Sequence, residues 1–220
     1  MKKKIGVVLS GCGVYDGSEI HEAVFTLLAI DRYGAEALCM APNAEFPVVN
    51  HLTGEATGAT RNALVEGARI ARGKIRDMGG VTAADLDAIV FPGGFGAAKN
   101  LCDFAVKGAE AEVLPEVARL LEEVIAAKKP VGAICIAPAL VAAALGKNFA
   151  PKLTIGTDEG TAEAINRTGS SHIACPVTGI VVDEKNRIVS TPAYMLAGRI
   201  SEAYEGIDKA VKAVIEMASK

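Results

Sequence analysis

Two hydrophobic patterns alternate along the chain. Short apolar runs bounded by Gly or Pro predict buried strands, whereas apolar residues three or four positions apart predict amphipathic helices. The predicted strands cover residues 5–10, 36–41, 87–91, 131–134, 153–156, 179–183 and 187–191. The last two strands flank Glu184-Lys185-Asn186, a polar turn that predicts an antiparallel hairpin.

Helical periodicity fills most of the space between these strands. We expect a first helix that Ser18 caps and Gly34 ends, with an inward-facing stripe of Ile20, Val24, Leu27 and Leu28. The other predicted helices cover residues 113–128, the alanine-rich stretch after Cys135, and residues 199–218. The segment 48–80 is less regular, and there we predict a short strand at 48–52 and a helix at 58–72.

The alternation of strands and helices predicts an α/β fold, with a mostly parallel sheet and helices on both of its faces. Hydrophobic residues make up 50% of the 220 positions and aromatic residues only 5%, with no tryptophan. Ala, Val, Ile and Leu therefore form the core, as is typical of helices packed on a buried parallel sheet. No linker or repeat divides the sequence, so we expect one domain over 1–220.

Charge and cysteine usage narrow the functional classes. The net charge is -3 and the only basic cluster is Lys2-Lys3-Lys4, so we expect no nucleic-acid partner. No apolar run approaches the length of a membrane helix, so no membrane partner is expected either. The five cysteines include no C-x-x-C pair, which argues against disulfides and a structural metal and favours a reducing cytoplasm. They are Cys12, Cys39, Cys102, Cys135 and Cys175.

Cys135 has the sequence context of a nucleophile, because it lies between a predicted strand and the alanine-rich helix. A side chain on such a turn is exposed above the sheet and close to a helix N-terminus, which favours the thiolate. We therefore predict a thiol pKa below the free value and the fastest alkylation among the five cysteines. A small buried core residue would fit the position alone. Gly93-Gly94, which can place a second amide beside that of Ile136 in an oxyanion hole, favours the nucleophile.

Other motifs exclude further chemistry. Gly11-Cys12-Gly13 follows the first strand as a dinucleotide-binding turn would, but Asp16 occupies the third glycine position and would repel a pyrophosphate. We expect no cofactor. His172 and Cys175 are only two ligands without a third, so no metal is expected. His172 is followed by Ile173-Ala174 and not by the His-x-Glu pattern of amidotransferase triads.

Several stretches together resemble the PfpI superfamily of class I glutamine amidotransferase-like proteins. Ala133-Ile134-Cys135-x-Ala137-Pro138 and Phe91-Pro92-Gly93-Gly94 carry this resemblance. Further stretches resemble the ElbB branch of that superfamily, and together they span most of the chain. They are Leu9–Glu22, Asn50–Glu55, Thr154–Asp158 and Thr191–Met195.

The resemblance implies a flavodoxin-like three-layer sandwich, a nucleophilic Cys135, no cofactor and a homodimer. It also implies a glutamate on the first helix against the sulfur. Counting back from Gly34 places this residue at Glu22, with Glu19 as the competitor whose charge would otherwise complement the helix dipole. Ile136 stands where protease-like members have histidine, which argues against peptide hydrolysis. His51 and His172 are candidates for a missing polar contact.

These residues lead to a functional hypothesis. We expect a cytoplasmic, cofactor-independent glyoxalase that converts glyoxal or methylglyoxal and water to the hydroxy acid through a hemithioacetal on Cys135. Glu22 would move the proton between carbons, and the amides of Gly94 and Ile136 would hold the oxyanion. Deglycase activity on early glycation adducts fits the same site. A non-enzymatic redox-sensing or stress-protective protein and an amidotransferase-like protein without a complete triad are the alternatives.

Overall fold

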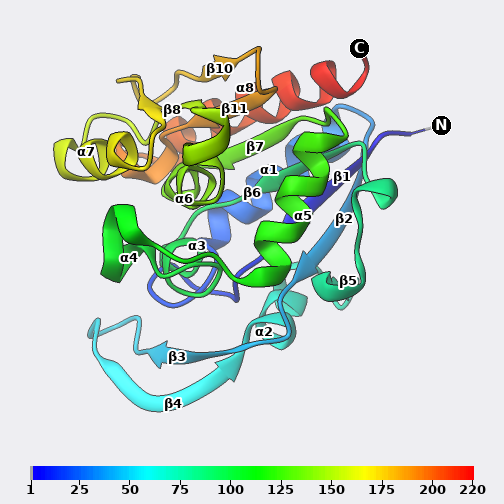
Figure 1. Cartoon of the computed structure of the whole chain (residues 1–220). Coiled ribbons are helices and arrows are strands. Elements are labelled where there is room, and N and C mark those ends of the chain that lie inside the picture. The colour runs from blue at the N-terminus through cyan, green and yellow to red at the C-terminus, as the bar shows by residue number, and fades with distance from the viewer. Residues whose placement is uncertain (1) are drawn as a thin grey trace.

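A seven-stranded sheet runs through the centre of the computed structural model, which describes residues 2–220 (Figure 1). Its strand order is β10-β11-β7-β6-β1-β2-β5, and all neighbours are parallel except the antiparallel pair β10 and β11. The strands are β1 (Lys4–Val8), β2 (Glu36–Ala41), β5 (Ile75–Asp77), β6 (Ala88–Phe91), β7 (Val131–Ile134), β10 (Val181–Asp183) and β11 (Ile188–Thr191).

Helices cover both faces of this sheet. On one face lie α1 (Ile20–Arg32) and α8 (Ile200–Ala218), and on the other lie α3 (Phe95–Lys99), α5 (Pro115–Ala126) and α6 (Ala137–Phe149). Each face has its own cluster of buried apolar side chains, which gives three layers. The predicted α/β class with a mostly parallel sheet is confirmed. Within residues 2–220, none of the helices combines the length and apolarity needed to cross a membrane.

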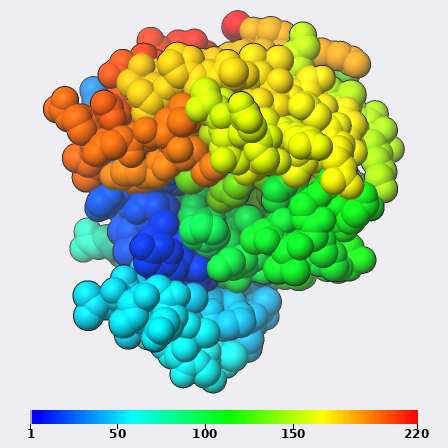
Figure 2. Space-filling model, turned by 90° about the vertical axis from the view of Figure 1, so that its left-hand side faces the viewer, coloured from blue at the N-terminus to red at the C-terminus, as the bar shows by residue number. Residues whose placement is uncertain are grey.

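The segment predicted as a strand and a helix over 48–80 folds differently. Strands β3 (Glu45–Val49) and β4 (Ala56–Asn62) form an antiparallel hairpin, and α2 (Ala63–Ile70) begins only after it. The helix starts here because the Asn62 side chain accepts hydrogen bonds from the amides of Leu64 and Val65. The hairpin projects away from the sheet, and it forms the cyan lobe at the bottom of Figure 2.

Two further short helices and a small sheet are also present. They are α4 (Phe104–Lys107), α7 (Glu159–Arg167) and a small parallel sheet of β8 (Lys152–Leu153) and β9 (Ser171–His172). The strand predicted at 153–156 is therefore wrong beyond Leu153. Thr154 leaves the ladder because its amide donates to the hydroxyl of Ser190, 2.9 Å away, on the neighbouring strand β11.

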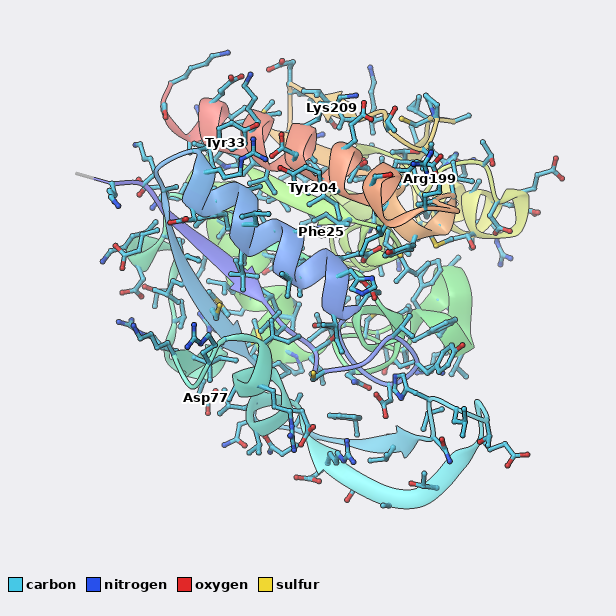
Figure 3. All side chains as sticks on the ribbon, turned by 180° about the vertical axis from the view of Figure 1, so that it is seen from behind. Phe25, Tyr33, Asp77, Arg199, Tyr204 and Lys209 are labelled. Carbon is cyan, nitrogen blue, oxygen red and sulfur yellow. The ribbon has the colours of Figure 1, made fainter. Side chains whose placement is uncertain are left out.

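The buried face of α1 is also not the predicted one. Ile20, Val24 and Leu28 are 42%, 45% and 43% exposed, whereas Glu22 and Thr26 are fully buried. The polar side chains tolerate burial because both are hydrogen-bonded, and the small Ala23 and Ala29 on the same face allow close packing. Figure 3 shows α1 lying beside α8, where Phe25 and Tyr204 meet edge to face with ring centroids 5.4 Å apart.

The helix cap also differs from the prediction. Glu19, not Ser18, caps α1, and its carboxylate accepts a 2.7 Å hydrogen bond from the amide of Glu22. The Ser18 hydroxyl instead accepts from the amide of Ser10, at 2.9 Å, and holds the loop after β1 closed. Gly34 follows the end of the helix with a positive φ of 72°, as expected of a terminating glycine.

Candidate active site

Cys135 occupies the turn between β7 and α6, as the sequence predicts. Its φ is +62°, in the left-handed region that costs a residue with a side chain free energy. Its amide donates to the carbonyl of Thr191 on β11, 2.9 Å away, which fixes the turn. The strained turn directs the sulfur above the carboxyl ends of the strands, where ligands bind in open parallel sheets.

Glu22 meets Cys135 from helix α1. The carboxyl is fully buried and lies close enough to the thiol that each group shifts the pKa of the other. Two backbone amides hold it in place: Gly93 donates to Oε2 at 3.0 Å, and Tyr194 donates to Oε1 at 3.1 Å. Of the two glutamates considered, Glu22 therefore contacts the sulfur, and Glu19 serves as the helix cap.

The surroundings of Glu22 favour its neutral form. Burial raises the pKa of its carboxyl to about 8, and the nearby charge of Glu19 acts in the same direction. The amides of Tyr194 and Gly93 oppose this rise by stabilising the carboxylate. At neutral pH most molecules therefore carry a protonated Glu22, and a carboxylate forms within reach of physiological pH.

The prediction of a low pKa for Cys135 is wrong. Burial, followed by the negative charge of Glu22, raises the pKa of the thiol well above its usual range, although the amides of Gly94 and Ile136 act in the opposite direction. The side chain is only 7% exposed and lies beside a carboxyl group, and both features raise the pKa of the thiol. Their effect is larger than the lowering of the pKa by the helix N-terminus. The thiol needs a base at the moment of attack, and Glu22 is in contact with it. The order of alkylation among the five cysteines stays a prediction.

The amides of Gly94 and Ile136 lie close enough to the Cys135 sulfur to lower the pKa of its thiol. Whether they also reach a substrate oxygen, as the predicted oxyanion hole requires, stays a prediction. Gly94 has a φ of +94°, and a Cβ on it would lie 2.3 Å from the amide nitrogen of Glu19. Only glycine lets this turn approach the loop before α1 so closely.

The close packing around Gly93 leads to a testable prediction about the spacing of Cys135 and Glu22. A Cβ at this position would lie 2.4 Å from the Cβ of Cys135 and 2.5 Å from Oε2 of Glu22, so Gly93→Ala must push the pair apart. If the protein has the glyoxalase activity that the sequence predicts, we expect its turnover to fall by about a hundredfold or more. Gly80→Ala is the matched control, because a Cβ at Gly80 meets nothing within 4 Å. Equal turnover in the two variants would show that the spacing of the pair is unimportant.

A pocket of about 420 Å³ opens above the pair. Its walls come from five separate parts of the chain, which meet on the face seen in Figure 2. The lining residues are Val14, Glu19, Gly94, Phe95, Cys135, Ile136, Asp158, Thr161, Tyr194 and Met195.

Neither candidate histidine lines this pocket. His51 Nε2 accepts a 3.2 Å hydrogen bond from the amide of Tyr15, which ties the β3–β4 hairpin to the loop after β1. His172 lies in β9 and accepts from the amide of Ile155 at 3.3 Å. In residues 2–220, no group of three or more His, Cys, Asp and Glu side chains is arranged to hold a metal ion.

Tyr194 is one of the site residues that sequence reasoning missed. Its amide holds Glu22, its side chain lines the pocket, and its hydroxyl lies 2.9 Å from Nδ1 of the exposed His21. The available signal was its place just after β11, the strand next to β7. The carboxyl ends of neighbouring parallel strands meet at the same edge of a sheet, so residues after Thr191 belong near Cys135.

Comparison with known proteins finds relatives that cover nearly the whole chain. No family model matches the chain. The chain is 44% identical over 230 residues to "ES1 protein homolog, mitochondrial" of Rattus norvegicus, across 100% of this chain and 85% of that protein. It is also 44% identical over 228 residues to "Glutamine amidotransferase-like class 1 domain-containing protein 3, mitochondrial" of Homo sapiens, across 99% and 84% of the two chains.

Solved structures show the same fold. An isoprenoid biosynthesis protein with an amidotransferase-like domain from Ehrlichia Chaffeensis superposes with a TM-score of 0.90 and 40% identity, covering 97% of this chain and 99% of that one. DJ-1beta of Drosophila melanogaster, at 18% identity and a TM-score of 0.60 over 100% and 97% of the two chains, shares the fold. The narrower ElbB assignment stays a prediction.

The expected cytoplasmic location is contradicted by these relatives, because the rat, human and Danio rerio proteins are all named as mitochondrial. The assignment to a superfamily is supported by the sequence identity to these relatives. An identity of 44% across the whole of this chain accompanies a cysteine with a positive φ at a strand-to-helix turn, the position that the resemblance implies. The chain belongs to the ES1 family of glutamine amidotransferase-like class 1 domain proteins.

Proposed function

We propose that this protein is a cofactor-independent glyoxalase, which converts glyoxal and water to glycolate and treats methylglyoxal by the same route. The observation that carries the proposal is the buried pair of Cys135 and Glu22 at the base of an open pocket, with two amides directed at the sulfur. A nucleophile, a base with a pKa near the working pH and an oxyanion hole are the parts that this reaction needs.

The first step is addition of the thiol to an aldehyde. The Cys135 sulfur bonds to one carbonyl carbon as its proton passes to the Glu22 carboxylate, and the new alkoxide is held by the amides of Gly94 and Ile136. Glu22 then returns this proton to the alkoxide. The product is a neutral hemithioacetal, and Glu22 is again a carboxylate, free to act a second time.

The second step is an internal proton transfer. The Glu22 carboxylate takes the proton from the sulfur-bearing carbon and delivers it to the adjacent carbon, while the hydroxyl proton of the hemithioacetal passes to the aldehyde oxygen of that adjacent carbon. One carbon is thereby oxidised to the thioester carbonyl as its neighbour is reduced to a primary alcohol. The result is a glycolate thioester on Cys135. Water hydrolyses the thioester, which releases glycolate and restores the thiol. No external oxidant or reductant is consumed.

The alternative functions receive less support from the site. Oxidation of a redox-sensing cysteine follows exposure and thiolate character, but Cys135 is buried and its thiol pKa is raised. An amidotransferase triad needs a histidine beside the cysteine, and none lines the pocket. Early glycation adducts would use the same nucleophile and base, so deglycase activity belongs to the same proposal.

Turnover of glyoxal by Cys135→Ala tests the proposal directly. We expect purified wild-type protein to release glycolate, measured by chromatography, and Cys135→Ala to fall to the rate of the uncatalysed reaction. Cys39→Ala is the matched control, because Cys39 is buried in β2 away from the pocket. It should lose about 1 kcal/mol of stability and keep its turnover per folded molecule. Glycolate release that persists in Cys135→Ala would reject the proposal.

We also propose a homodimer built on helix α1. Ile20, Val24 and Leu28 form an exposed apolar stripe one helical turn apart, on a helix that Figure 3 shows uncovered. A two-fold axis across this helix would bury the same stripe in both copies.

Val24→Glu should weaken such a dimer by about a hundredfold or more, because the axis brings two buried charges together. Sedimentation velocity at micromolar concentration measures the change. Val65→Glu, at a 63% exposed position on α2, should leave the dimer intact. A monomeric wild-type protein would reject the dimer and leave the proposed reaction untouched.

A further inference from the structure

A second hollow lies next to the pocket above Cys135. A second hollow of about 280 Å³ adjoins the first of about 420 Å³, and Phe95, Ile136 and Thr161 line both. The two neighbouring hollows, together named the groove, lie above the sulfur and between α3 and α7. Ligand pockets of roughly 300–1,000 Å³ bury molecules far larger than glyoxal, which has four non-hydrogen atoms.

The two hollows differ in the charge of their lining residues. Around Cys135 the lining includes the carboxylates of Glu19 and Asp158. The second hollow is lined by apolar side chains such as Ala98, Phe104 and Ala164, and none of its lining residues is charged. Phe95, which is 46% exposed, lies at the boundary between them.

Positive charge is absent from the lining of both hollows within the described chain. Lys99 lies nearby, with its Nζ 4.8 Å from the centre of the Phe95 ring, but it lines neither hollow. His21 contacts the Tyr194 hydroxyl at the rim and lies 3.9 Å from a Glu19 oxygen. A substrate carboxylate or phosphate would therefore meet two carboxylates and no lysine or arginine in the groove.

We propose that the groove selects a carbonyl compound with an apolar substituent and no negatively charged group. The carbonyl carbon lies at the Cys135 sulfur, and the substituent extends past Phe95 into the second hollow. This inference rests on the proposed function, in which the sulfur adds to a carbonyl carbon, and it names the class of substrate that the site prefers over glyoxal.

Thiol-labelling rates test this selectivity without requiring turnover. Methanethiosulfonates transfer a thioalkyl group to the sulfur and release methanesulfinate, and their methyl, benzyl and sulfonatoethyl forms differ in the group they carry. Labelling of Cys135 is followed by peptide mass mapping, and each rate is divided by that of a free cysteine peptide. We expect the benzyl reagent to be favoured about tenfold over the methyl reagent. The sulfonatoethyl reagent should be the slowest.

Two leucine substitutions on α7 provide the matched comparison. Ala164→Leu fills the second hollow and should bring the benzyl preference down to the value for free cysteine, with the methyl rate unchanged. Ala162→Leu makes the same change on the same helix at a position that lines neither hollow, and it should keep the preference.

The outcomes separate this inference from the proposed reaction. A benzyl preference in the wild type no greater than that of free cysteine would overturn the groove, as would its equal loss in both leucine variants or a preference for the sulfonatoethyl reagent. Glyoxal turnover measured alongside would remain valid evidence for the glyoxalase. A benzyl preference without any aldehyde turnover would support the groove and reject the glyoxalase.

Discussion

Replacement of Glu22 by Gln is expected to lower kcat/KM for glyoxal by roughly 10³-fold, while Cys135 remains open to labelling. The amide of Gln cannot accept the thiol proton or carry a proton between carbons, which are the two tasks assigned to Glu22. Glycolate release and mass mapping of labelled Cys135 give the two measurements. Near-normal turnover in Glu22→Gln would remove this residue from the mechanism.

The pH dependence of kcat/KM in the wild type is a second test of the role of Glu22. Because the carboxylate form is the base, kcat/KM should rise with pH and level off above the pKa of Glu22, which is about 8. The charge of Glu19 helps to raise that pKa, so Glu19→Gln should move the rise to lower pH and retain turnover. Loss of turnover in Glu19→Gln together with normal turnover in Glu22→Gln would assign the base to Glu19.

The turn at Cys135 could be predicted from sequence because its signals are local. An apolar strand, a cysteine and an alanine-rich helix follow one another directly, and parallel strands bring Gly93 to the same sheet edge. The partners that complete the site are remote. Glu22 is separated by 71 residues from the amide of Gly93 and by 172 from that of Tyr194, so no periodic pattern could reveal these contacts.

The errors have physical causes of their own. Helical periodicity identifies an apolar face of a helix but does not show what that face packs against. On α1, Ala23 and Ala29 are buried in the core, whereas Ile20 and Val24 face outward. A sequence also cannot show how deeply a thiol is buried. For Cys135, burial and a neighbouring carboxyl outweigh the helix N-terminus on which the expected low pKa was based.

The β3–β4 hairpin illustrates a third cause. Strand β4 is almost fully exposed along its length, and its small and polar residues give neither a helical nor an alternating pattern of hydrophobicity. Pairing with β3, whose Phe46 and Val48 are buried, makes it a strand. Such a strand is defined by its partner, so the residues before Asn62 were wrongly included in the helix.

The stability of the wild type should fall as pH rises through the range where Glu22 loses its proton. The folded protein holds this proton up to a pKa of about 8, whereas an unfolded chain releases it near the ordinary value of 4.5. Between these values the folded state binds more protons, so the free energy of unfolding decreases as pH rises. The gap between the two pKa values corresponds to on the order of 5 kcal/mol.

Glu22→Gln isolates this contribution, because Gln has no proton to lose. Its single carbonyl oxygen can satisfy only one of the amides of Gly93 and Tyr194, so the variant should be less stable than the wild type at pH 5 by about 1–2 kcal/mol. At pH 9 the order should reverse, since only the wild type then buries a carboxylate. Urea unfolding at a series of pH values measures both curves.

The matched control for this reversal of the stability order between pH 5 and pH 9 is Glu66→Gln. Glu66 is a second buried glutamate, but its carboxylate pairs with Arg69 at 2.8 Å and Arg61 at 3.5 Å. Its replacement should lower the free energy of unfolding across the whole range and leave the wild-type slope unchanged. Parallel curves for the wild type and Glu22→Gln would mean that Glu22 is ionised in the folded protein throughout, and the carboxyl group would then lack the proton affinity on which its role as base and acid depends.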